Sequence, residues 1–73
     1  MRVQISHARL LRDLLEYLRE CGCVAEQVSK AEADVSLPEL NNEPVGARLE
    51  LGIYLTAWRV RHEGVAAVII DRP

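Results

Sequence analysis

The two cysteines carry the most reactive side chains in this chain of 73 residues. Cys21 and Cys23 are separated only by Gly22. Thiolates bind soft metal ions, but a closed zinc site needs four ligands, and the two histidines, His7 and His62, stand far away in the sequence. A disulfide between such near neighbours would constrain almost no loop. We therefore expect both cysteines to behave as small apolar side chains, with no metal ion or cofactor bound.

The hydroxyl and carboxylate side chains form no recognisable catalytic set. Ser6 precedes His7, but Ser6 also stands where a helix is expected to begin, and helix capping explains a serine there. Glu32 and Asp34 belong to a predicted hairpin, where no apolar pocket would perturb their carboxyl groups. The four glycines are too scattered for a phosphate-binding loop. We therefore predict a protein without enzymatic activity.

The longest predicted element is a helix from Asn42 to His62, whose apolar residues fall into two opposite stripes when placed at about 100° per residue. The first, here called the Leu49 stripe, consists of Val45, Leu49, Ile53, Thr56 and Val60, with Gly52 at its border. The second, here called the Trp58 stripe, consists of Ala47, Leu51, Tyr54, Leu55 and Trp58. A surface helix of a monomer normally has one apolar stripe, so two stripes indicate a helix covered on both sides.

The composition of the two stripes suggests which one covers the protein's own sheet. The Leu49 stripe has β-branched residues and a glycine that permits close approach, which favours packing on a sheet. The Trp58 stripe has the aromatic residues that are enriched at interfaces. We therefore predict a homodimer with Leu51, Leu55 and Trp58 at its interface and Tyr54 at the rim. The alternative is that Trp58 and Leu55 pack against the other helix of the same domain.

The remaining periodicities predict the order β-α-β-β-α-β. A second helix is expected between His7 and Cys21, because five leucines recur there at helical spacing, with Ser6 as its N-cap and Gly22 ending it. Alternation of apolar and polar residues predicts strands at residues 2–5 and 33–37, with a less regular strand at residues 23–28. The apolar, β-rich run at residues 65–70 predicts a fourth strand. This is the order of a ferredoxin-like plait. If the first strand does not form, the fold class is an α-β-β-α-β two-layer sandwich.

The last predicted strand is apolar on both sides. Val68 and Ile70 point one way, and Ala67 and Ile69 point the other. A strand that is buried on both faces requires cover on both sides of the sheet, whereas two helices would cover only one. The strand is therefore a second indication of self-association, and pairing through the sheet is an alternative to pairing through the long helix.

Length and composition limit the class of protein further. Seventy-three residues suffice for a single domain, residues 1–73, with a modest core. Arg12 and Asp13 interrupt the first leucine cluster, so it does not resemble a signal peptide, and no apolar run is long enough to cross a membrane. Free thiols favour a reducing, cytoplasmic setting. A net charge of -2 argues against a nucleic-acid binder, and the absence of phenylalanine argues against the stacking surface of an RNA-recognition motif.

These observations favour a small, non-enzymatic cytoplasmic module that self-associates as a homodimer and acts through protein contacts. A different protein partner is also compatible with an uncovered apolar stripe. The alternative function is a small-molecule or metal-ion sensing domain, with its ligand at the subunit interface or near Cys21 and Cys23.

Overall fold

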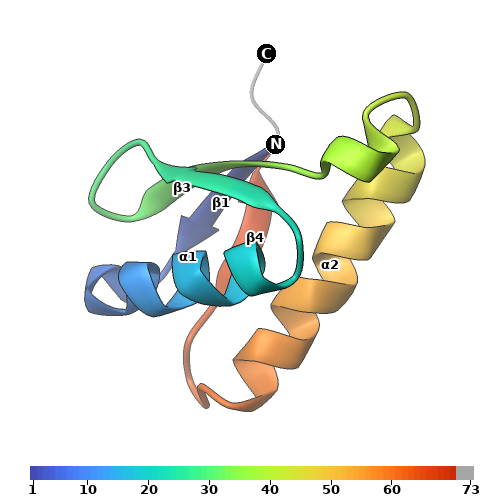
Figure 1. The fold of residues 1–73 in the computed structure, drawn as a ribbon. Helices are drawn as coiled ribbons and strands as arrows, with labels where there is room; N and C mark the ends of the chain where they lie inside the picture. Colours follow the sequence, from blue (N-terminus) through green and yellow to red (C-terminus); the bar gives the residue numbers. More distant parts are fainter. Residues whose placement is uncertain (71–73) are drawn as a thin grey trace.

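The computed structural model describes residues 1–70, which form one antiparallel sheet and two helices (Figure 1). The strands and helices are β1 (Arg2–Ile5), α1 (Leu11–Glu20), β2 (Val24–Gln27), β3 (Glu32–Ser36), α2 (Pro44–Val60) and β4 (Ala67–Ile70). The order across the sheet is β2-β3-β1-β4, and every neighbouring pair is antiparallel. The predicted ferredoxin-like plait, including its first strand, is therefore confirmed.

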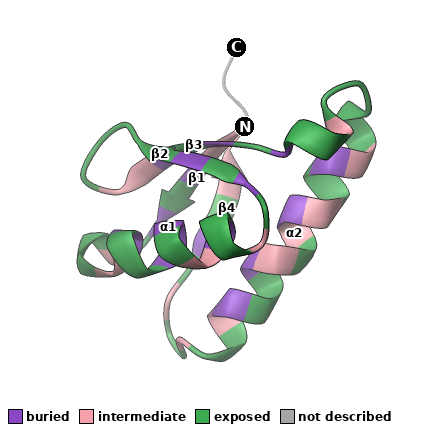
Figure 2. Ribbon diagram, in the orientation of Figure 1, coloured by how far each residue is buried: buried purple, intermediate pink, exposed green. Residues whose placement is uncertain are grey.

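The core lies on one face of the sheet, between the strands and both helices. Val3, Ala33 and Val35 alternate along their strands with exposed or half-buried polar residues, and all three are fully or almost fully buried. Figure 2 shows the buried residues of α2 on the side that faces α1 and the sheet. The opposite sheet face, which carries Gln4 and Asp34, is left without a covering helix.

The predicted first helix is shorter than expected, and its predicted cap is wrong. Residues 8–10 form a single 3-10 turn, and α1 begins at Leu11. The hydroxyl of Ser6 accepts a hydrogen bond from the backbone N–H of Ala66 at 2.8 Å, so it joins β1 to the segment before β4 instead of capping the helix. Gly22 ends α1 as predicted, since its φ of 91° is readily available only to glycine.

The long helix occupies most of its predicted range. It begins at Pro44, a position where a backbone N–H would have no hydrogen-bond acceptor within the helix, so the missing N–H of proline costs nothing. The residue that precedes the helix is Glu43 and not Asn42. Residues 38–40 form a second 3-10 turn shortly before this helix. Within residues 1–70, no helix is long and apolar enough to cross a membrane.

The last strand, which is apolar on both faces, is not buried on both faces in the single chain. β4 is an edge strand, and Val68 is exposed while Ile69 and Ile70 are half-buried. On the helix side Ala67 is buried. The strand is thus as apolar as predicted, but the described part of the chain does not cover it.

Candidate protein–protein interface

The structure reverses the predicted assignment of the two stripes of α2. Leu51, Leu55 and Trp58 are at most 2% exposed and belong to the core of the chain itself. In the Leu49 stripe, Val45, Leu49, Ile53 and Val60 are 62–79% exposed. Leu51, Leu55 and Trp58 are therefore not at the surface of the folded chain, and Tyr54, predicted at the rim of the interface, is half-buried. The stripe that was predicted to cover the sheet is the exposed one.

Trp58 is held in the core by contacts that connect the two helices. Its indole Nε1 donates a hydrogen bond to Oδ2 of Asp13 on α1 at 2.9 Å. The imidazole of His62 stacks on the indole, with ring centroids 4.0 Å apart, and its Nε2 lies 3.2 Å from the same Asp13 oxygen. The alternative in which Trp58 packs against the other helix is the one that the structure shows. The spacing of Trp58 and His62, one helical turn apart, was a signal for this stack.

The exposed Leu49 stripe continues into the free edge of the sheet. A shallow apolar groove is lined on the α2 side mainly by Leu49, Gly52 and Ile53, and on the β4 side by Ile69. A second, adjoining hollow is bordered by Gly52 together with Val68 and Ile69. Helix and strand therefore form a single surface, here called the α2–β4 surface. Isolated apolar side chains are common on proteins, but a continuous patch of this kind is typical of an interaction site.

Two residues of the Leu49 stripe are less suited to a core than those of the Trp58 stripe. Thr56 gives the Leu49 stripe a hydroxyl, which donates a hydrogen bond to the carbonyl oxygen of Gly52 at 2.9 Å. Gly52 contributes no side chain to a core. The Trp58 stripe has larger side chains and no comparable gap, so it is the more effective of the two at filling the interior.

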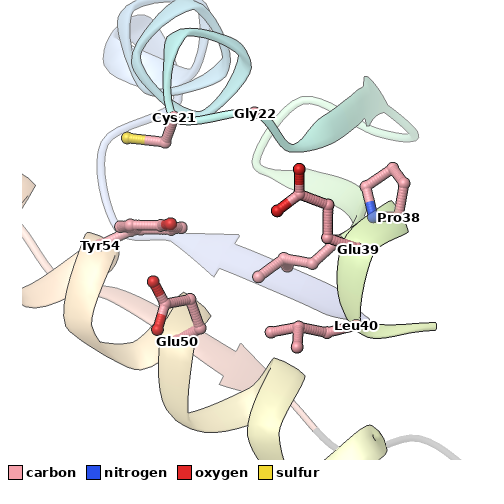
Figure 3. Close-up of a pocket in the computed structure, with 8 residues that line it drawn as sticks. Cys21, Gly22, Pro38, Glu39, Leu40, Glu50 and Tyr54 are labelled. Atoms are coloured by element: carbon pink, nitrogen blue, oxygen red, sulfur yellow. The ribbon is translucent and has the colours of Figure 1, made fainter. Parts of the chain in front are cut away.

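A small pocket lies at the opposite side of α2, between the end of α1 and the 3-10 turn at residues 38–40 (Figure 3). Its volume is about 150 Å³. Tyr54 and Glu50 reach it from α2, Cys21 from the end of α1 and Glu39 from the turn. The lining is acidic and also offers a phenol and a thiol, which suits a small cationic or hydrogen-bond-donating group.

The two cysteines remain free, and Cys23 is buried next to this region. Burial raises the pKa of the Cys23 thiol, and the nearby Cys21 and Glu50 raise it further, so the thiol stays protonated and unreactive near neutral pH. Within residues 1–70, no group of three or more histidine, cysteine or acidic side chains is placed to hold a metal ion.

The two tyrosines link the helices and are stabilised in their neutral form. The hydroxyl of Tyr17 donates a hydrogen bond to the backbone oxygen of Tyr54 at 2.9 Å. Burial raises the pKa of Tyr17, with a further contribution from a hydrogen bond with Cys21. A side-chain hydrogen bond with Glu50, followed by burial, raises the pKa of Tyr54 to about 12 from its ordinary 10.0.

We expect the Tyr54 hydroxyl to make the stability of the fold depend on alkaline pH. Because its pKa is higher in the folded chain, the contribution is fully present below pH 10.0 and is lost as the pH rises towards about 12. Tyr54→Phe removes this group. The difference in free energy of unfolding between the unmodified chain and the variant should therefore shrink across that interval, measured by denaturant titration at several pH values. A difference that is constant with pH would contradict the assignment.

Comparison with protein-family models gives no match, and neither curated protein sequences nor solved structures give one. The α2–β4 surface and the pocket at Cys21 are therefore the features of the chain that indicate a function.

Proposed function

We propose that this chain is a non-enzymatic cytoplasmic module that self-associates and acts through protein contacts made by the α2–β4 surface. The observation that carries the proposal is the Leu49 stripe, whose four large side chains are 62–79% exposed on the outside of α2. Free cysteines support the cytoplasmic setting, since it is reducing.

The size of the uncovered patch supports association. Covering one such largely exposed aliphatic side chain contributes about 1 to 2 kcal/mol. In a pair, the four side chains of each copy are covered, eight in all, which together contribute about 8 to 16 kcal/mol. This contribution offsets the free-energy cost of association, which is about 4 to 15 kcal/mol. The free edge of β4 adds backbone hydrogen-bonding groups that a neighbouring strand would satisfy.

The proposal is tested by labelling the surface with hydroxyl radicals at low and high protein concentration. Leu49, Ile53 and Val60 should become protected from labelling as the concentration rises. Val24 and Val28, which are also exposed but lie at the other edge of the sheet, serve as internal controls and should not change. Labelling of the stripe that is independent of concentration would overturn self-association through this surface.

The pocket at Cys21 supports a second candidate function, binding of a small molecule. Its acidic lining favours a small primary amine over an anion. A rise in the melting temperature with such amines, lost in Glu50→Gln, would support this candidate. Equal shifts in the unmodified chain and the variant, or no shift across a series of amines, would remove it.

A further inference from the structure

We propose that the α2–β4 surface is covered by a second copy of this chain. The two copies are related by a twofold axis that lies at Val68 of β4 and between Gly52 and Ile53 of α2. In this arrangement the two sheets join through their β4 edges, and the two α2 helices pack antiparallel beside each other. The inference rests on the proposed self-association and adds the geometry of the pair.

The free edge of β4 has the hydrogen-bonding groups that such a junction needs. The N–H of Ser6 donates to the carbonyl oxygen of Ala66 at 2.8 Å, and Ile5 is opposite Ala67 in the register of β1 and β4. In an antiparallel ladder the backbone groups alternate in direction, so those of Ala67 and Ile69 point away from β1. A second β4 centred on Val68 would pair all of these outward groups, with Ala67 of each copy opposite Ile69 of the other.

The Leu49 stripe has the symmetry that an antiparallel helix pair requires. Measured from the midpoint between Gly52 and Ile53, its members lie at matching distances in opposite directions. A twofold axis at that midpoint therefore sets Val45 against Val60, Leu49 against Thr56, and Ile53 against Gly52 of the second copy. Each contact is made twice, as in any interface between two identical surfaces related by a twofold axis.

One axis can serve both contacts, because the two midpoints lie close together in the fold. Gly52 borders the same two hollows as Ile69, and one of these hollows also includes Val68. The helix stripe and the strand edge are therefore neighbours at the level where the axis passes. A partner that covered one of them would also reach the other.

Gly52 is the residue that most specifically indicates a close helix crossing. A glycine in the interior of a helix weakens it relative to alanine. A Cβ atom at Gly52 would meet nothing within 4 Å in the chain itself, so the fold of the single copy does not need a glycine there. In the proposed pair, the space above Gly52 receives Ile53 of the second copy.

The charges beside the stripe fit a partner of the same sequence. Glu43 precedes the N-terminus of α2, and Arg61 follows its C-terminus. Antiparallel alignment about the proposed axis brings Glu43 of one copy to the end of the helix where the other copy carries Arg61. The helix dipoles also oppose each other in this alignment, which is favourable.

Gly52→Ala tests the helix crossing, with Gly46→Ala as its matched control. At Gly46 a Cβ atom would make ordinary contacts with Glu43, and this residue lies outside the stripe. We expect Gly52→Ala to raise the denaturation midpoint of the dilute, monomeric chain, yet to raise the dissociation constant of the pair at least about 10-fold. Gly46→Ala should leave the dissociation constant unchanged. An unchanged dissociation constant for Gly52→Ala would overturn the crossing.

Val68→Cys tests the strand register in a chain that also carries Cys21→Ser and Cys23→Ala. In the proposed pair the two Val68 positions face each other in a non-hydrogen-bonded pair, about 4.5 Å apart between Cα atoms, which suits a disulfide. Glutathione disulfide should therefore cross-link this variant, and should not cross-link Val24→Cys at the other edge in the same background. Failure to cross-link while the chain remains dimeric would overturn this geometry alone. A chain that is monomeric at every concentration would overturn both this inference and the proposed function.

Discussion

Trp58→Ala is expected to lower the free energy of unfolding by about 3 to 5 kcal/mol, the range for removal of a large buried aromatic side chain. Trp58 is 2% exposed, and its loss would leave a cavity between α1, α2 and the sheet. A domain of 73 residues has a total stability of about 4 to 11 kcal/mol, so the variant should be partly or wholly unfolded. Denaturant titration followed by circular dichroism measures the change.

Val60→Ala is the matched control, because Val60 lies on the same helix in the exposed stripe. In the dilute monomer its effect should stay within about 0.5 kcal/mol, as for most surface substitutions. The comparison separates the two interpretations of α2. If Trp58→Ala gave a fully folded monomer of nearly unchanged stability, then Trp58 would belong to an interface, as the sequence alone suggested, and the core described here would be wrong.

The paired substitution Leu49→Glu and Ile53→Glu is expected to abolish association while leaving the fold intact. Both side chains are mostly exposed, and glutamate is a good helix former, so the single copy should tolerate the change. In a pair, however, each carboxylate would be buried against apolar side chains without a partner, which costs several kcal/mol. The dissociation constant should therefore rise by at least about 100-fold, a factor equivalent to about 2.8 kcal/mol.

The change of charge in this variant needs its own control. Val24→Glu together with Val28→Glu adds the same two negative charges at the opposite edge of the sheet. Its dissociation constant should remain within a factor of about 2 to 3 of the unmodified chain, since surface charges at that distance are largely screened by salt. An equal loss of association in both variants would show that net repulsion, and not the Leu49 stripe, controls the pair.

Local sequence pattern was sufficient to predict the fold. The leucines of α1, the alternation in β3 and the glycine after α1 each identify an element, and their order yields the plait. The predicted ends of the helices and strands were less accurate, because the residue at which an element ends depends on single hydrogen bonds. Ser6 illustrates this: a serine before a helix usually caps it, but here the N–H of Ala66, distant in the sequence, uses the hydroxyl.

The orientation of α2 could not be read from its helical wheel alone. A wheel gives the angle between the Leu49 and Trp58 stripes but does not say which of them faces the sheet. That choice depends on how well each set of side chains fills the space above the strands, which is a property of the assembled core. Trp58 also contacts Asp13, which is distant in the sequence, and His62, which lies beyond the end of α2.

Sedimentation equilibrium of the unmodified chain over a wide dilution series tests the central claim most directly. We predict a mass equal to two chains at high concentration, falling to that of one chain on dilution, as expected for a surface held together mainly by one apolar stripe and one strand edge from each copy. The mass of a single chain at every concentration would contradict self-association, and would leave the exposed Leu49 stripe without the partner proposed for it.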